Sequence, residues 1–504
     1  MKIGSRGYTI IKDDYPPSFI KQIREDLTVK PYVNTDYGPP PASFPVYGES
    51  KKKLYLPRFY GIEKLGNTDN IHLNNAAPIN LHFSKSLRPK QIPIINTYIK
   101  EAKRIGGGII SVPCGYGKTV LALKLIAELK VKTLVIVHKE FLLNQWKDRI
   151  SEFLPEARVG RIQGNVIKTK ETDIVIGMLQ SVSMKDYNED VFSDFGLVIY
   201  DECHHLGAEV FSKALLKTNF KYLLGLSATP KRADGLSKVF EWYLGPIAYS
   251  IKKRDDTNVD VKVIDYFEED PAYSKICLNM KQKPNLPIMI NNITRYDPRT
   301  DLIVEQAYQC LLDGRKLLIL SDRRDHLKTL KFKFDNITES IWTLLYLQKN
   351  KLKFNTEIWK NILSFYCNNI LYTAGFYLGG MKQRDLEQSE RCNIILGTFS
   401  MASEGFDCKY PLNTIILGSP KSNIEQAVGR ILRQEKDKIK KVPLVIDIND
   451  NFSIFSKQTI KRIKFYKQNK YRITRYDKEL NQLEVLSDVT TKNKKKACDL
   501  AFLD

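Results

Sequence analysis

Residues 111–119 contain the chemical groups that bind phosphate in many nucleotide-binding proteins. The stretch reads SVPCGYGKT. Such a glycine-rich turn can point backbone N–H groups at phosphate oxygens, while Lys118 adds a positive charge and the Thr119 hydroxyl reaches Mg²⁺. The general pattern begins with glycine, where this chain has Val112. The stretch therefore predicts a phosphate-binding loop, and the alternative is a glycine-rich turn that starts a helix.

An acidic pair, Asp201 and Glu202, directly follows the apolar run 197–200. In open parallel sheets, ligands bind at the carboxyl ends of the strands. Asp201 would hold Mg²⁺ there, and Glu202 would orient and deprotonate the water that attacks the γ-phosphate. Lys118 and Asp201 come from one predicted sheet, which favours a nucleoside triphosphatase over a simple acidic turn.

Two further groups of residues fit the same chemistry. Ser227 and Thr229 follow the next predicted strand, where their hydroxyls can bond to the acidic pair and sense the γ-phosphate. Gln426, Arg430 and Arg433 are spaced to share one face of a predicted helix. The second half has no phosphate loop or acidic pair of its own, so these arginines are expected to act on the first half's nucleotide, an effect worth about 10³–10⁵ in rate. Taken alone, the alternatives are an ordinary turn and an exposed basic helix face.

Short apolar runs that alternate with helical segments must position these groups. In the first half they are residues 108–110, 133–137, 173–176, 197–200 and 222–226, with a helix over 120–129. In the second half they are residues 316–320, 393–396, 414–417 and 442–446. Strands that are buried on both faces and joined by helices predict an α/β protein with parallel, doubly wound sheets.

The domain boundaries follow from the breaks in this pattern. We expect a small N-terminal α+β domain at 1–85, an α/β domain at 86–252, a linker and domain start at 253–300, a second α/β domain at 301–450, and a basic C-terminal helix and tail at 451–504. A helical insertion is expected at about 333–370, which packs on its own domain or recruits a partner. In the N-terminal domain, residues 51–53 with Tyr55 form either a nucleic-acid contact or a solvated loop.

Composition narrows the class of partner. Lysine and arginine outnumber aspartate and glutamate by 79 to 57, a net charge of +22 that favours a polyanion. There is no apolar run near the roughly 18 residues of a membrane span, and the start of the chain lacks a signal-peptide core. The eight cysteines are scattered without metal-ligand spacing. We therefore expect nucleic acid as partner, no membrane, and a reducing intracellular compartment.

Eight motifs in order resemble those of the superfamily 2 helicases. They are the phosphate loop at 112–119, VHK and QW at 137–146, GMLQS at 177–181, DECH at 201–204, SATP at 227–230, SDRR at 321–324, GTFSMASEGFD at 397–407 and QAVGRILR at 426–433. The first loop position often lacks glycine in that family, which accounts for Val112. LRPKQ at 87–91 and YLGGMK at 377–382 resemble the XPB-type branch. Within that branch, the chain is most similar to helicases of large cytoplasmic DNA viruses, including the poxvirus transcript-release helicase and its asfarvirus and mimivirus relatives.

The resemblance implies two tandem RecA-like domains, with ATP and Mg²⁺ as cofactors and a DNA or RNA strand, single or in a duplex, as partner. The implied catalytic residues are Lys118, Asp201, Glu202, Gln426, Arg430 and Arg433. The implied nucleotide-binding residues are Arg88, Gln91, Val112, Pro113, Cys114, Gly115, Tyr116, Gly117, Lys118, Thr119 and Asp407, with Thr119 and Asp201 on Mg²⁺. Coupling is assigned to His204, Ser227 and Thr229. Contacts to strand phosphates are assigned to His138, Lys139, Gln180, Ser181, Arg323, Thr398 and Ser400.

From these features we predict an ATP-dependent 3′–5′ DNA helicase or translocase that serves viral transcription by releasing transcripts. We expect a monomer that engages the viral transcription machinery, in the viral factory of the host cytoplasm and in the virion. An RNA helicase is one alternative. Another is an ATP-gated nucleic-acid-binding scaffold whose inserted helices recruit a partner. Residues 231–234 depart from the Arg-Glu-Asp element that the XPB branch carries after SATP, which leaves strand separation open.

Overall fold

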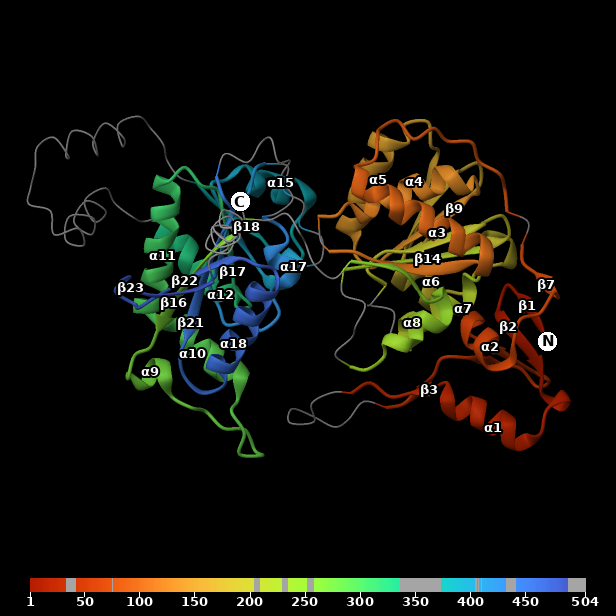
Figure 1. Ribbon diagram of the computed structural model, residues 1–504, viewed down its shortest axis with the longest axis horizontal. Helices are drawn as coiled ribbons and strands as arrows, with labels where there is room; N and C mark the ends of the chain where they lie inside the picture. Colours follow the sequence, from red (N-terminus) through yellow and green to blue (C-terminus); the bar gives the residue numbers. More distant parts are fainter. Residues whose placement is uncertain are drawn as a thin grey trace, which may run out of the picture. The chain divides into compact units, whose positions relative to one another are not determined.

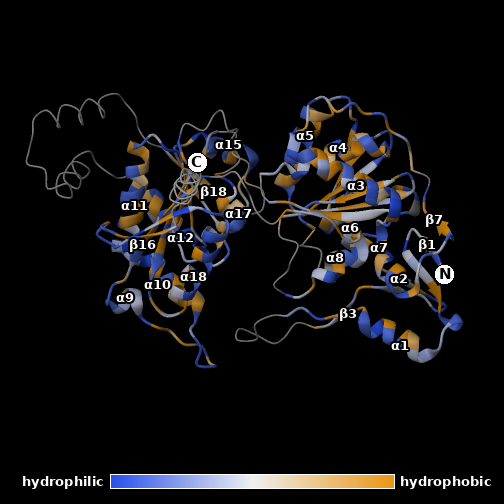
Figure 2. Ribbon diagram, in the orientation of Figure 1, coloured by the Kyte–Doolittle hydropathy of each residue, from blue (hydrophilic) through white to orange (hydrophobic). Residues whose placement is uncertain are grey.

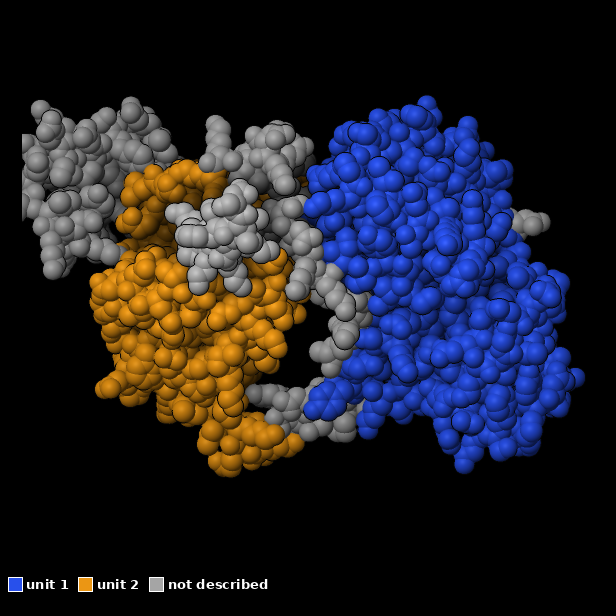
Figure 3. Space-filling model, in the orientation of Figure 1, with its two compact units in different colours: residues 1–252 blue, residues 253–504 orange. Residues whose placement is uncertain are grey.

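The computed structural model contains two compact units, residues 1–252 and 253–504 (Figure 3). It describes residues 1–32, 42–74, 76–113, 115–203, 209–228, 234–251, 258–335, 373–403, 406, 408, 410–431 and 441–487. Within these ranges, no helix combines the length and the apolar character needed to cross a bilayer.

The first unit is built on an eight-stranded sheet with the order β11-β10-β12-β9-β13-β14-β8-β15. Its strands are β8 (Gly107–Ser111), β9 (Thr133–Val137), β10 (Val159–Gln163), β11 (Val166–Lys168), β12 (Ile174–Met178), β13 (Leu197–Tyr200), β14 (Tyr222–Ser227) and β15 (Ile247–Ser250). Every pairing is parallel except that of β10 with β11. The parallel sheet predicted from the apolar runs is thereby confirmed.

Helices cover both faces of this sheet. They are α3 (Ile92–Ile105), α4 (Lys118–Leu129) and α5 (Glu140–Phe153) on one side, and α6 (Leu179–Met184), α7 (Glu209–Lys217) and α8 (Ser237–Leu244) on the other (Figure 1). Successive strand residues point to opposite faces. On β9, Leu134 and Ile136 therefore join one hydrophobic core while Val135 and Val137 join the other. In Figure 2 the surrounding helices combine hydrophobic and hydrophilic residues, as expected for helices that cover a buried sheet.

The N-terminal residues form a small α+β layer within the first unit. Its five-stranded sheet has the order β5-β6-β2-β1-β7. The elements are β1 (Lys2–Gly4), β2 (Gly7–Ile11), α1 (Pro17–Asp26), β5 (Gly48–Glu49), β6 (Lys53–Leu56), α2 (Arg58–Leu65) and β7 (Ile71–His72), with β3 (Thr28–Val29) paired to β4 (Phe44–Pro45). Arg58 is buried and donates to the carbonyls of Ile105, Phe220 and Lys221. These hydrogen bonds connect the N-terminal layer to the amino-terminal edge of the large sheet. Burial lowers the pKa of the Arg58 guanidinium to about 10.

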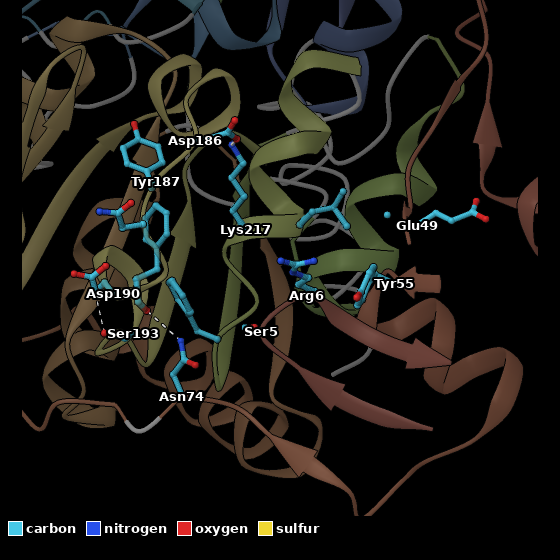
Figure 4. A pocket seen from close by; sticks show the side chains of 15 residues that line it. Ser5, Arg6, Glu49, Tyr55, Asn74, Asp186, Tyr187, Asp190, Ser193 and Lys217 are labelled. Atoms are coloured by element: carbon cyan, nitrogen blue, oxygen red, sulfur yellow. Dashed lines mark hydrogen bonds and ion pairs between the residues drawn. The ribbon is translucent and has the colours of Figure 1, made fainter. Parts of the chain in front are cut away.

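A cavity of about 570 Å³ lies between the N-terminal strands and the loops that lead into β13 and β14. Figure 4 shows Arg6 beside Tyr55 on one side and Tyr187 with Asp190 on the other. The Arg6 guanidinium lies 5.2 Å from the centre of the Tyr55 ring. Because these loops precede their strands, the cavity is at the amino-terminal edge of the sheet. Tyr55, a candidate nucleic-acid contact, lines it, whereas the residues predicted to bind or hydrolyse the nucleotide do not.

The second unit contains another eight-stranded sheet, with the order β18-β19-β17-β20-β21-β16-β22-β23. Its strands are β16 (Asp260–Tyr266), β17 (Leu317–Leu320), β18 (Ala374–Tyr377), β19 (Ile394–Gly397), β20 (Thr414–Leu417), β21 (Leu444–Asp450), β22 (Arg472–Tyr476) and β23 (Gln482–Ser487). Its helices are α9 (Pro271–Ser274), α10 (Leu286–Arg295), α11 (Asp297–Leu312), α12 (Arg324–Asp335), α15 (Gln383–Arg391), α16 (Phe399–Ser403), α17 (Glu425–Val428) and α18 (Ser453–Gln468). All pairings are parallel except β22 with β23. Each unit thus contains one RecA-like domain, and the first also contains the N-terminal α+β layer.

One segment of this unit differs from the sequence-based expectations, and another lies mostly outside the described residues. The basic helix expected after residue 451 ends at Gln468, and β22 and β23 follow it. The reason is that β16 presents an open edge, on which Arg472–Tyr476 forms a parallel ladder. Of the expected insertion at 333–370, residues 333–335 complete α12 and the remainder lies outside the described residues.

Candidate functional site

The loop after β8 has the backbone of a phosphate cradle. Val112 is fully buried, and its N–H donates to the carbonyl of Ser227 at 3.1 Å. Valine at this position therefore packs in the core, which explains why glycine is not required. Gly115 and Gly117 have φ of 81° and 87°, values that favour glycine, and Gly117 is the N-cap of α4. Cys114 lies outside the described residues.

The predicted lysine and acidic pair meet at the carboxyl edge of the sheet. Lys118 Nζ lies 2.7 Å from Glu202 Oε1. Asp201 accepts one hydrogen bond from the Glu202 N–H at 3.0 Å and another from Trp146 Nε1 at 2.9 Å. Glu202 has φ of 48°, so its backbone turns sharply after β13. The structure thus brings together Lys118, Asp201 and Glu202 as the sequence predicted.

Trp146 is the member of this cluster that the sequence reasoning missed. It lies on α5, is almost completely buried, and holds one carboxylate oxygen of Asp201. The QW pair at 145–146 belongs to the eight motifs, but neither its residue types nor its spacing assigns the indole a role. A buried indole N–H usually finds a partner, and here the partner is the acidic pair.

The electrostatics of the cluster favour a bound cation. Burial raises the pKa of Asp201, and the neighbouring Glu202 carboxylate raises it further, while Lys118 and the Trp146 N–H act in the opposite direction. Burial also lowers the pKa of His138 and of Lys139, which follow β9. A desolvated carboxylate pair beside a lysine and a glycine-rich loop fits the donor set of a magnesium–triphosphate complex. Thr119 and Asp201 are the residues that would hold the metal.

Gln91 contacts the loop directly. It ends the 3₁₀ segment Pro89–Gln91 and is only 4% exposed. Its Oε1 accepts from the Arg88 N–H, and its Nε2 donates to the Tyr116 carbonyl, both at 3.0 Å. A side chain on Gly117 would collide with this amide. Base recognition by Arg88 and Gln91 stays a prediction, and the contact with the loop is new.

Of the three predicted coupling residues, Ser227 is described. It ends β14, is fully buried, and its carbonyl receives the Val112 N–H. His204 and Thr229 lie outside the described residues.

The predicted strand contacts of the first unit lie at the same sheet edge as the acidic pair. His138 and Lys139 follow β9, and Gln180 and Ser181 begin α6 after β12. Strands β12, β9 and β13 are parallel neighbours, so their carboxyl ends are adjacent. The Ser181 hydroxyl accepts from the Gly164 N–H at 2.9 Å.

In the second unit, the predicted strand contacts also follow parallel strands. Arg323 follows β17, and its guanidinium donates to Asn291 Oδ1 and to the Pro287 carbonyl. Thr398 and Ser400 follow β19 and share a hydrogen bond of 3.2 Å between their hydroxyls. Because β17 pairs with β19, these residues share one edge of the second sheet.

The segment with the predicted arginines differs from the expectation of a continuous helical face. Helix α17 covers only Glu425–Val428, so Gln426 is helical and Arg430 lies in the turn that follows. Arg430 is 5% exposed, and its Nε donates to the Ala402 carbonyl of α16 at 2.6 Å. The helix therefore ends earlier than the spacing of Gln426, Arg430 and Arg433 predicted, and Arg430 is buried in the turn that follows. Arg433 and Asp407 lie outside the described residues.

Comparisons with known proteins agree with this architecture. Residues 84–232 match the family model of the type III restriction enzyme, res subunit. A protein of Acanthamoeba polyphaga mimivirus named "Putative ATP-dependent RNA helicase" is 36% identical over 484 residues, which cover 94% of this chain and 86% of that protein. A protein of African swine fever virus with the same descriptive name is 30% identical over 369 residues, or 71% of this chain and 67% of its own.

A solved structure shares the fold at low sequence identity. It is a fragment described as "a putative HsdR subunit of a type I restriction enzyme" from Vibrio vulnificus YJ016, with a TM-score of 0.52 and 17% identity. The match covers 80% of this chain and 71% of that one.

Two RecA-like units, with a phosphate loop and an acidic pair at one sheet edge and the eight motifs in order, identify a superfamily 2 helicase. The chain belongs to the family of viral ATP-dependent helicases that includes the mimivirus and African swine fever virus proteins. The resemblance drawn from the eight motifs is confirmed.

Proposed function

We propose that this helicase uses ATP and Mg²⁺ to move 3′–5′ along DNA and serves viral transcription by releasing transcripts. The observation that supports ATP turnover is the cluster of Lys118, Asp201, Glu202 and Trp146 beside a glycine-rich loop. The XPB-like motifs favour DNA. The mimivirus and African swine fever virus relatives carry names of RNA helicases, which makes RNA the second candidate.

The residues of the first unit divide the work of hydrolysis. Lys118 and the N–H groups around Gly115 and Gly117 bind the triphosphate. Thr119 and Asp201 hold the metal, which supplies positive charge beside the reacting phosphate. Trp146 keeps Asp201 in place, and Glu202 orients the attacking water and accepts its proton.

Residues of the second unit act on the same reaction. We assign charge stabilisation during phosphoryl transfer to Arg430 and Arg433, with Gln426 as a further contact. Asp407 is assigned to the nucleotide as well, and His204, Ser227 and Thr229 to coupling.

The strand is held through its phosphates. In the first unit His138, Lys139, Gln180 and Ser181 are assigned to this contact; Arg323, Thr398 and Ser400 serve in the second. Phosphate contacts carry little sequence information, and a net charge of +22 suits salt-dependent binding without sequence preference. We further propose a monomer that engages the viral transcription machinery in the cytoplasmic factory and in the virion.

The test compares ATP hydrolysis in the presence of DNA and RNA strands of matched length and sequence, followed by forked duplexes of both polarities. We expect DNA to stimulate ATP hydrolysis. We also expect the protein to displace a strand from forks that have a 3′ single-stranded tail. Stimulation by RNA alone would overturn the DNA proposal. Strong strand-dependent hydrolysis without displacement on either fork would make the protein a translocase.

A further inference from the structure

Two loops at the carboxyl edge of the second sheet are directly joined. The β17 loop, residues 321–323, carries Arg323, a proposed strand contact. The β20 loop, residues 418–424, leads into α17 and so to Gln426 and Arg430. Strands β17 and β20 are parallel neighbours, which places the two loops side by side.

The joint between the loops is centred on Asp322. Lys421 Nζ lies 2.7 Å from Asp322 Oδ2, and the Asp322 N–H donates to the Ser419 hydroxyl at 2.9 Å. The Asp322 and Lys421 side chains are 26% and 38% exposed. An ion pair this accessible contributes little to the stability of a fold. Its place between two functional loops suggests another role.

Two buried arginines fix the backbone of the β20 loop. Arg462 Nη1 donates to the Lys421 carbonyl at 2.7 Å, while its other nitrogens bind Asp447 of β21. Arg299 Nη1 donates to the Gly418 carbonyl at 2.6 Å, while its other nitrogens bind Asp450.

Both arginine–aspartate pairs are almost fully buried. Bidentate arginine–carboxylate pairs hold a fixed geometry. The Gly418 and Lys421 carbonyls are therefore each held by a buried arginine, and the Lys421 side chain links their loop to the β17 loop.

We propose that the ion pair between Asp322 and Lys421 couples strand binding at Arg323 to the segment that bears Gln426 and Arg430. Arg323 here donates to Asn291 and to the Pro287 carbonyl of the α10 region. A strand phosphate on this guanidinium competes with those acceptors and shifts the β17 loop. Asp322 is the next residue in the chain, so Lys421 follows the shift and passes it toward α17. Asp322 and Lys421 are thus positioning residues, and the inference rests on the proposed function.

The test uses the full chain with Lys421→Met and Asp322→Asn, and measures ATP hydrolysis with and without the strand that best stimulates the wild type. Basal turnover should remain within about twofold, because neither residue contacts the proposed nucleotide groups. Stimulation by the strand should fall about tenfold, within the range of typical coupling free energies. Strand affinity, measured by fluorescence anisotropy without nucleotide, should change by less than about threefold.

Charge exchange provides the rescue. Asp322→Lys and Lys421→Asp should each abolish most of the stimulation, and the double variant should restore a substantial part of it. Lys441→Met is the matched control: Lys441 is similarly exposed and pairs with Asp313 in the same unit, at the amino-terminal edge of the sheet. Its stimulation should equal that of the wild type.

Several results would overturn the coupling role. Normal stimulation of Lys421→Met and Asp322→Asn would do so while leaving the proposed function intact. Parallel losses of strand affinity and stimulation, without rescue by the exchange, would make the two residues simple strand contacts. A wild type that no strand stimulates would refute both the proposed function and the coupling.

Discussion

The carboxyl edges of the two sheets hold buried aspartates in opposite ways. In the second unit, Asp447 and Asp450 each receive two nitrogens of a buried arginine and a tyrosine hydroxyl. In the first unit, Asp201 accepts from Trp146 and from the Glu202 N–H, both neutral donors, and has a second carboxylate beside it. The second unit therefore pairs each of these aspartates with an arginine, whereas in the first unit Lys118 faces both carboxylates of the acidic pair, an edge that a bound cation would complete. The same fold thus carries arginine-paired aspartates in one unit and, in the other, the acidic pair that we propose for the reaction.

The largest effect on turnover is expected at Glu202, which differs from Asp447 and Asp450 in that its carboxylate pairs with Lys118 of the phosphate loop. Glu202→Gln keeps the shape of the side chain and removes the base, so turnover should fall about 10⁴-fold, near the upper range for general acid–base catalysis. Binding of ATP and of the strand should persist, as measured by filter binding and anisotropy. Full residual hydrolysis would refute the role given to Glu202.

Arg430 tests whether the second unit does more than provide a scaffold. Arg430→Ala should lower turnover about 10³-fold while changing ATP affinity far less, because an arginine finger acts on the charge of the transition state. Single-turnover hydrolysis and equilibrium ATP binding separate the two effects. Since Arg430 also holds the Ala402 carbonyl, thermal unfolding of the variant must be measured alongside. Equal losses in binding and turnover would assign the residue to binding alone.

The scaffold itself is tested by breaking one of its buried pairs. Arg299→Met leaves Asp450 buried without its guanidinium and should destabilise the second unit by about 3 kcal/mol, toward the lower end for buried pairs because Tyr273 still donates to Asp450. Urea unfolding followed in both units would measure it. The control is Lys328→Met in the same unit, where the pair with Asp325 is largely exposed and should contribute less than about 1 kcal/mol. Similar losses for both variants would contradict the scaffold interpretation.

The acidic pair and Lys118 in the first unit could be predicted from the sequence, whereas the buried arginine–aspartate pairs of the second unit could not, for a physical reason. Lys118 follows β8 after the glycine-rich loop and Glu202 follows β13, and the rule that ligands bind at strand ends brought them together correctly. The Arg299–Asp450 pair joins residues 151 positions apart, and neither has a local signature. The helix expected from Gln426 to Arg430 ends instead at Val428, because helical spacing does not reveal a turn after four residues. The strands β22 and β23 were missed because their stability comes from the open edge of β16.

The smallest effect on turnover is predicted at Trp146, which tests whether a neutral donor is needed to hold Asp201. Trp146→Phe keeps an aromatic ring in the core while removing the N–H that holds Asp201. A hydrogen bond to a charged group contributes about 1.5–3 kcal/mol, and water or a metal can replace part of it, so turnover should fall about tenfold. The concentration of Mg²⁺ needed for half-maximal nucleotide binding should rise, because Asp201 is the proposed metal holder, whereas strand affinity should stay constant. If turnover and the Mg²⁺ concentration for half-maximal binding both remain at wild-type values, the indole serves packing alone. Asp201 is then positioned by the backbone of β13.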